Sequence, residues 1–74
     1  MVVKVEVYND GTQWCARGIG EELFTCGASL DELLGEIKDA AACHFEDRLR
    51  AGEPLNIIIL TETEVAGAAT AAAN

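Results

Sequence analysis

The side chains best able to do chemistry in this chain are its acids, with thirteen Asp and Glu against five Lys and Arg. Hydrolysis assisted by Mg²⁺ needs several carboxylates that converge on one point of the fold. The candidates are Glu6 and Asp10 near the N-terminus, then Asp31, Glu32, Glu36 and Asp39. Glu6 alternates with valines, Asp10 suits a turn, and the later acids lie away from the apolar stripe of a helix. We therefore predict no metal site, no cofactor and no catalytic residue.

The remaining reactive groups are one histidine, His44, and three cysteines, Cys15, Cys26 and Cys43. They form no C-x-x-C or Cys/His zinc pattern. Cys43 and His44 are neighbours in a predicted helix, so their side chains point about 100° apart and do not make a nucleophile–base pair. We predict that His44 is a half-buried packing residue, that Cys15 and Cys26 lie in the sheet, and that all three thiols are free in a reducing cytoplasm.

The formal net charge is −8. Binding to nucleic acids needs clustered Lys and Arg, and binding to anionic membranes needs a basic surface, so the charge disfavours both. The start MVVKVEVYNDG lacks a signal-peptide pattern, and no apolar run approaches the roughly 20 residues of a membrane span. We expect a cytoplasmic protein. A basic protein partner fits the charge, although on charge alone the acidity is better explained by solubility.

Periodicity predicts the element order β-β-β-α-β. Strands are expected at residues 2–8, 13–17, 23–26 and 55–60. Val3, Val5 and Val7 alternate with polar residues and form one buried face. The turn signal Asn9–Thr12 joins the first two strands as an antiparallel hairpin.

A helix is predicted from Ser29 to about Arg50. Ser29-Leu30-Asp31-Glu32 matches a capping box, in which the Ser29 hydroxyl accepts from the Glu32 N–H and the Glu32 side chain reaches back to the Ser29 N–H. Apolar residues recur at spacings of three and four and form one stripe: Leu30, Leu33, Leu34, Ile37, Ala41, Phe45 and Leu49. Gly52 is a suitable stop.

The last predicted strand, Leu55–Leu60, is apolar on both faces, which predicts burial on both sides by its own chain or by a neighbour's. We place it beside the first strand, near the edge of the sheet. Residues 65–74 form an Ala-rich tail that we expect to be disordered. The fold class is therefore α+β: one domain over residues 1–64, with one long helix packed on a small mixed sheet.

The sequence resembles the HicB-like antitoxin family, whose core is similar to a partial ribonuclease H fold. The motifs that carry the resemblance are Asp10-Gly11, Trp14 with Ala16, Leu23–Gly27, Ser29–Leu34 and Ile37–Ala40. The family shows D-G-x-x-W-x-A, then F-x-x-G, then T/S-L-E-E-A and N-I-K-E-A.

The sequence departs from the family pattern in two places. The loop Gly18–Glu22 has no proline where the family reads P-x-L-P-G, and an Ala-rich tail stands where the family carries a DNA-binding module, so we expect no such module here. The resemblance implies an isolated HicB-like domain that does not repress a promoter by itself.

The resemblance also implies a function, a non-catalytic module that sequesters a small basic HicA-like toxin. Candidate contacts with that protein are the acids Glu21, Glu22, Glu32, Glu36 and Asp39. A domain of this size is marginally stable alone, so we expect a homodimer or a tetramer, with Ile58 or Leu60 at the contact. The second hypothesis is an orphan homo-oligomer with a role unrelated to a toxin. The third is a degenerate nuclease or nucleic-acid binder, which the charge disfavours.

Overall fold

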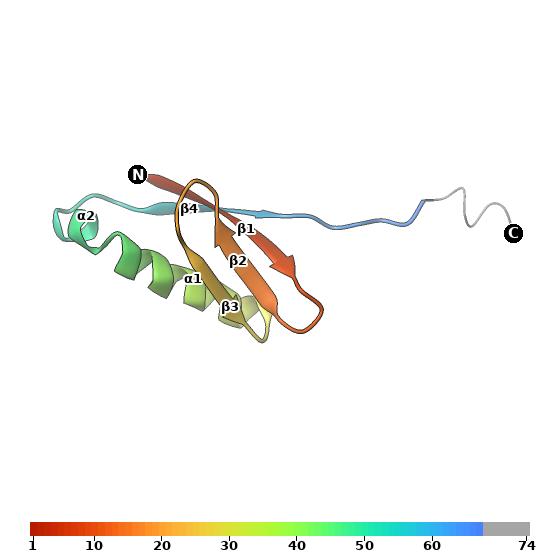
Figure 1. Ribbon diagram of the computed structural model, residues 1–74. Helices are drawn as coiled ribbons and strands as arrows, with labels where there is room; N and C mark the ends of the chain where they lie inside the picture. The colour runs from red at the N-terminus through yellow and green to blue at the C-terminus, as the bar shows by residue number, and fades with distance from the viewer. Residues whose placement is uncertain (68–74) are drawn as a thin grey trace, which may run out of the picture.

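The computed structural model describes residues 1–67, and these form one small α+β domain (Figure 1). The elements are β1 (Val2–Asn9), β2 (Trp14–Gly18), β3 (Phe24–Gly27), α1 (Leu30–His44), α2 (Glu46–Arg50) and β4 (Asn56–Thr61). The predicted class and element order are confirmed, with one short helix added. Of the predicted tail, residues 65–67 have no regular secondary structure, and residues 68–74 lie outside the described residues.

The four strands form one mixed sheet in the order β3-β2-β1-β4. β1, β2 and β3 are joined in sequence as antiparallel neighbours, whereas β4 returns after the helices and pairs with β1 in parallel. The predicted position of the last strand, beside the first and at the sheet edge, is therefore confirmed. α1 lies over β3 and β2 rather than over β4 (Figure 1).

The turn between β1 and β2 is held by side-chain carbonyl and carboxylate oxygens. Asn9 Oδ1 accepts from the N–H of Gly11 at 2.8 Å, and Asp10 Oδ1 accepts from the N–H groups of Thr12 and Gln13, both at 2.9 Å. Gly11 has φ of 99°, a conformation that favours glycine. The bonds from Gln13 and Thr12 hold the pKa of Asp10 below its ordinary value. Asp10 is thus a turn residue, as the sequence predicts.

The core lies between α1 and the facing side of the sheet. Its buried members are Val3, Val5, Val7, Ala16, Leu23, Leu33, Ile37, Ala41 and Phe45. Alternate positions of β1 supply the valines and positions three and four apart on α1 supply the helix side, so both periodicities read from the sequence are confirmed. Trp14 packs at the margin of this core beside Ala16.

The predicted N-cap is confirmed, because the Ser29 hydroxyl accepts from the Glu32 N–H at 3.1 Å. The reciprocal bond differs by one residue, since the Glu32 carboxylate accepts from the N–H of Ala28 at 3.0 Å. The prediction that Leu30 is part of the buried stripe is wrong, because its exposed fraction is 45%. Leu30 is the first helical residue, and α1 meets the sheet from Leu33 onward.

The prediction of one continuous helix to Arg50 is also wrong. α1 ends at His44, and Phe45 has non-helical torsion angles (φ −112°, ψ 29°) before α2 begins. The interruption accompanies burial of the Phe45 ring in the core, whereas α2 contributes no buried residue. The buried stripe therefore ends at Phe45. Gly52, with φ of 85°, follows α2 as the predicted stop.

β4 does not have both faces buried within its own chain. Ile57 packs against the core, but Ile58, Ile59 and Leu60 are 40–46% exposed. Since α1 lies over the other half of the sheet, β4 has no cover from the helix (Figure 1). That a neighbouring chain covers these exposed side chains remains a prediction.

Candidate protein-binding surface

Within residues 1–67, no helix covers the side of the sheet away from α1 (Figure 1). Because side chains alternate along a strand, the positions between the buried core residues all point to this side. We call it the open face, and its members are Val2, Lys4, Glu6, Tyr8, Cys15, Arg17, Phe24, Cys26, Asn56, Ile58 and Leu60.

Large apolar side chains gather on the open face. Phe24 is 60% exposed, and Val2, Ile58 and Leu60 on the same side are also exposed. Val2, Ile58 and Leu60 belong to the adjacent strands β1 and β4, whereas Phe24 lies on β3 at the opposite edge, beyond Arg17 and Glu6. Exposed apolar side chains on a small domain are candidates for contact with another protein. Phe24 is the largest of these side chains and is an aromatic group, the kind of residue that dominates binding energy at interfaces.

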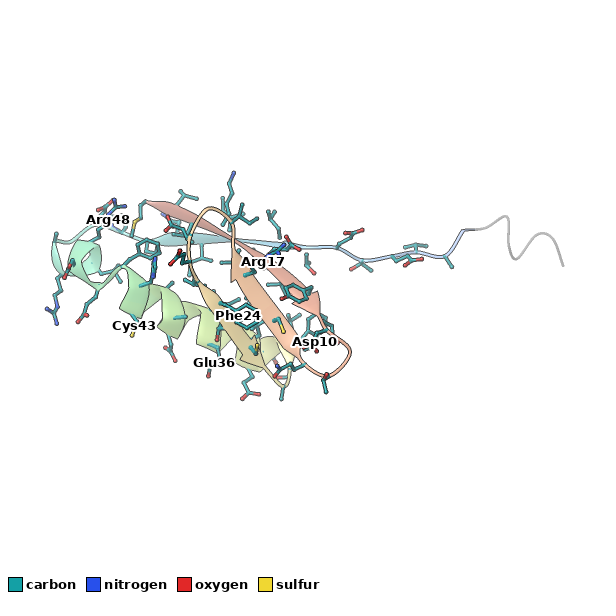
Figure 2. All side chains as sticks on the ribbon, viewed as in Figure 1. Asp10, Arg17, Phe24, Glu36, Cys43 and Arg48 are labelled. Carbon is teal, nitrogen blue, oxygen red and sulfur yellow. The ribbon has the colours of Figure 1, made fainter. Side chains whose placement is uncertain are left out.

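One row of the open face crosses all four strands. The pairing register sets Phe24 beside Arg17, Arg17 beside Glu6 and Glu6 beside Leu60. Arg17 Nη2 lies 3.0 Å from Glu6 Oε2, and this hydrogen bond raises the pKa of Arg17. Both side chains are exposed, so the ion pair adds little stability. The row therefore places an exposed ion pair between the apolar side chains of Phe24 and Leu60; Phe24 and Arg17 are labelled in Figure 2.

The outer edge of β4 presents unpaired backbone groups. The Asn56 N–H donates to the Met1 carbonyl at 2.9 Å, so this residue faces β1. Alternation along a parallel strand then turns Ile58 and Leu60 toward β1 and leaves the N–H and C=O groups of Ile57, Ile59 and Thr61 pointing outward. Such a row is a template for pairing with another strand.

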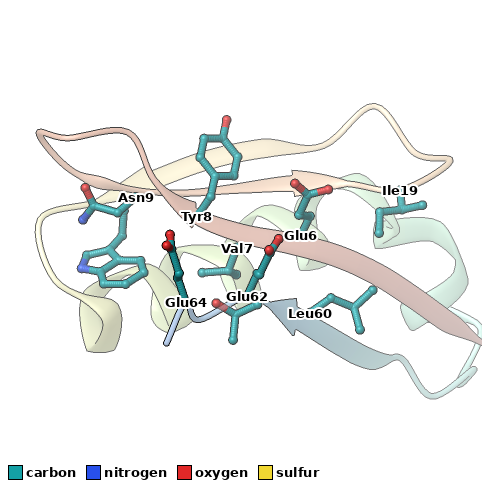
Figure 3. Close-up of a pocket in the computed structure, with 10 residues that line it drawn as sticks. Glu6, Val7, Tyr8, Asn9, Ile19, Leu60, Glu62 and Glu64 are labelled. Carbon is teal, nitrogen blue, oxygen red and sulfur yellow. The ribbon is translucent and has the colours of Figure 1, made fainter. Parts of the chain in front are cut away.

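A hollow of about 610 Å³ lies where the chain leaves β4 (Figure 3). Tyr8 and Leu60 line it, and its charged lining residues, Glu6, Glu62 and Glu64, are all acids. A basic side chain from another protein would find carboxylates and an aromatic ring together there.

The predicted acidic contacts are exposed and come from two segments, α1 and the loop before β3. Glu36 lies on the outer side of α1 (Figure 2), and Asp39 is exposed on the same helix. Glu32 lies one turn before Glu36 and caps the start of the helix. Glu21 Oε2 is 3.6 Å from Nε2 of His44, at the other end of α1. Glu32, Glu36 and Asp39 recur at spacings of four and three and therefore share one side of α1. Glu21 lies beside the end of the helix at His44, and Glu22 accompanies it in the exposed loop before β3.

The environment of His44 in the structure agrees only in part with the predicted packing role. Its ring packs edge-on against Phe45 with centroids 4.6 Å apart, which fits a packing histidine. Its side chain is 37% exposed, however, and it faces Glu21 from the loop between β2 and β3. That contact joins two segments far apart in the chain, so no local pattern signals it.

The predicted places of the cysteines are confirmed. Cys15 and Cys26 are neighbours on β2 and β3, Cys43 is exposed on α1, and all three are free thiols. Within residues 1–67, no three His, Cys, Asp or Glu side chains come together as metal ligands would. None of the helices in that range is long and apolar enough to cross a membrane.

Sequence reasoning missed the open-face row of Phe24, Arg17 and Glu6. Strand alternation was a usable signal, because Phe24 follows the core residue Leu23 and must point the other way. What alternation does not supply is the register between strands, and the register is what aligns the row.

The chain is similar to a UPF0150 protein of Archaeoglobus fulgidus. The two are 43% identical over 47 residues, which make up 64% of this chain and 68% of the A. fulgidus protein. No protein-family model and no solved structure matches the chain.

Proposed function

This chain belongs to the UPF0150 family, and we propose that it is a non-catalytic protein-binding module that resembles the toxin-sequestering domain of HicB-type antitoxins. The observation that carries the proposal is the set of exposed apolar side chains on the open face, above all Phe24 on the edge strand β3. A domain of 74 residues with half its residues apolar gains from covering such a surface with another protein.

The proposed partner is a small basic protein of the HicA-like toxin kind. A net charge of −8 favours encounter with a basic chain and disfavours nucleic acids and anionic membranes. In this proposal the open face supplies affinity by excluding water around Phe24. The acids on α1, chiefly Glu36 and Asp39, act at longer range and raise the association rate.

The same module is proposed to be a homodimer or a tetramer. The unpaired outer edge of β4 and the exposed side chains of Ile58 and Leu60 support this assembly. Phe24 lies on β3, at the opposite edge of the sheet. Self-association at β4 therefore leaves the Phe24 end of the open face free for the toxin. A monomer in sedimentation velocity at tens of micromolar would contradict the assembly.

The alternative is an orphan homo-oligomer whose role is unrelated to a toxin. The exposed apolar residues of β4 favour it as much as they favour the first proposal, since both use that edge. A third candidate, a degenerate nuclease or nucleic-acid binder, has the acidic charge against it.

The discriminating experiment is a pull-down of the tagged chain from native lysate, followed by mass spectrometry of the recovered proteins. Recovery of one small basic protein at a fixed ratio supports the antitoxin-like function. Recovery of this chain alone, under several growth conditions, supports the orphan oligomer. Tight binding of RNA or DNA to the purified domain at physiological salt would overturn both.

Two variants then test whether the open face or the acidic side of α1 contacts the proposed partner. Phe24→Ser removes the largest exposed apolar side chain of the open face and should raise the dissociation rate of the complex at least about tenfold. The double variant Glu36→Lys with Asp39→Lys should slow association and flatten its salt dependence. All three side chains are exposed, so circular dichroism should show an unchanged fold. Wild-type kinetics in both variants would place the contact elsewhere.

A further inference from the structure

Two free thiols face each other across the strand pair β2–β3. Cys15 and Cys26 are direct partners in the antiparallel register, and their Sγ atoms lie 3.5 Å apart. Both lie on the open face. Cys15 is buried, with 2% of its surface exposed, and Cys26 is half-buried.

The strand register also shows whether Cys15 and Cys26 form a hydrogen-bonded or a non-hydrogen-bonded pair of the ladder. The Gly18 N–H donates to the Leu23 carbonyl at 2.7 Å, which makes Gly18 and Leu23 a hydrogen-bonded pair. Pairs alternate along an antiparallel ladder, so Cys15 and Cys26, three positions on, are a non-hydrogen-bonded pair. In such pairs the Cα atoms are about 4.5 Å apart and the side chains approach most closely. That separation lies within the roughly 4.4–6.8 Å range that disulfides accept.

We propose that Cys15 and Cys26 form an oxidation site, at which hydrogen peroxide converts the two free thiols into a cross-strand disulfide. The sulfur atoms must approach by about 1.5 Å to reach the bonding distance of about 2.05 Å. Rotation of the two side chains supplies this movement, since the backbone separation is already suitable. The site is independent of the partner proposed above.

The difference in exposure between the two thiols predicts which sulfur reacts first with the peroxide. Cys26 is the accessible thiol, so its sulfur attacks one peroxide oxygen. An S–O bond forms, the O–O bond breaks, and the departing hydroxide leaves as water with the Cys26 proton. The Cys15 sulfur then attacks the Cys26 sulfur. The S–S bond forms, the S–O bond breaks, and the second hydroxide leaves as water with the Cys15 proton. Two electrons pass from the sulfur pair to one peroxide.

The surroundings of Cys15 suit the second step rather than the first. Burial, together with the neighbouring Cys26 thiol and the nearby Asp10 carboxylate, raises the pKa of Cys15 to about 11. Asp10 Oδ2 lies 3.7 Å from Cys15 Sγ. A thiol so rarely ionised is a poor attacker of free peroxide, but it reacts with a sulfenic acid held next to it because the two sulfurs are already in contact.

The first test uses the Cys43→Ser chain, which removes the exposed thiol on α1 and leaves only the pair. Hydrogen peroxide should remove both thiols and lower the intact mass by two hydrogen atoms. Arg17 lies between the two cysteines in the sequence, so trypsin should yield two peptides joined by a reducible bond. The cross-link closes a short loop and should raise Tm by roughly 10 °C, reversed by dithiothreitol.

Two comparisons make the test decisive. In urea the register is lost, so disulfide formation should slow at least about tenfold, and equal rates in the folded and unfolded chains would overturn the proposal. In the Cys15→Ala chain with Cys43→Ser, Cys26 should advance to sulfinic acid, because no resolving thiol remains. Sulfinic acid at Cys26 with an intact Cys15 thiol in the parent chain would also overturn it.

Discussion

The two edges of the sheet are built differently. β3 is four residues long, leads directly into α1 and has that helix packed against it. β4 is six residues long, consists largely of isoleucine and leucine, and has no helix over it. At one end of the sheet α1 packs against β3. At the other end β4 contributes only Ile57 to the margin of the core.

The difference supports the proposal that a second chain covers β4. Short strands and a packed neighbouring element are standard protections for a sheet edge, and β3 has both. β4 has neither, and its outward backbone groups lie beside side chains that are 40–46% exposed. In a domain too small to bury all of its apolar surface, the unprotected edge is the natural place for a second chain.

The largest effect is expected where α1 meets the protected edge. A Cβ on Gly27 would lie 2.7 Å from the Leu33 nitrogen and 3.0 Å from the Leu33 Cα. Both are backbone atoms that only movement of the helix can clear, so Gly27→Ala should lower the free energy of unfolding by about 3 kcal/mol in urea melts.

Gly35→Ala is the matched control on the same helix. A Cβ there meets nothing within 4 Å, so the substitution should raise stability by about 1 kcal/mol through helix propensity. If both glycine variants melt alike, the close packing of α1 on β3 is not what protects this edge.

The next effect concerns the unprotected edge. Ile59→Pro removes an outward N–H and leaves the bonds between β4 and β1 in place, as proline is tolerated at such edge positions. Self-association measured by sedimentation should weaken at least tenfold, which corresponds to about 1.4 kcal/mol.

Its control is Ile58→Pro, one residue away. The Ile58 N–H points toward β1, so this proline removes a bond of the sheet itself and should also release β4, seen as faster amide hydrogen exchange in β1. A dimer that survives Ile59→Pro would move the contact from the edge to the side chains of the open face, where Leu60→Lys becomes the test.

The two edges also show what the sequence predicts and what it does not. Alternation identified Val3, Val5 and Val7 as buried, the capping box identified Ser29, and the apolar run identified β4 as a strand beside β1. These signals are local. The helix break at Phe45 and the exposure of Leu30 depend on where the sheet ends beneath α1, which periodicity does not encode.

The candidate site was predicted less well for the same reason. The acids were predicted as contacts without their structural surroundings: Glu21 faces His44, and Glu32 accepts from the Ala28 N–H at the helix start. Phe24 and Arg17 become neighbours only through the register of β2 and β3. A site made of side chains aligned across strands is fixed by tertiary pairing, which no single segment specifies.

A smaller effect is expected at the junction of β3 and α1. Ser29→Ala leaves the Glu32 N–H without its acceptor and should cost about 1 kcal/mol in urea melts. Ser29→Asp retains an acceptor at this position and should melt like the wild type. Because the cap lies at the protected edge, neither variant should change self-association. A cap variant that alters the sedimentation of the folded protein would link the two edges.

The smallest effect is expected at the turn between the central strands, and it depends on pH. Asp10 has its pKa lowered from 3.8 by the bonds from Gln13 and Thr12. Its charged form is therefore favoured in the folded state, so its contribution to stability is complete above pH 3.8 and is lost as the pH falls through the folded-state pKa. Asp10→Asn retains an oxygen acceptor without the charge, so the wild type should lose stability relative to this variant as urea melts are taken from pH 5 down to pH 2. Parallel curves would contradict the lowered pKa. At neutral pH both proteins should self-associate equally, because the turn changes neither edge.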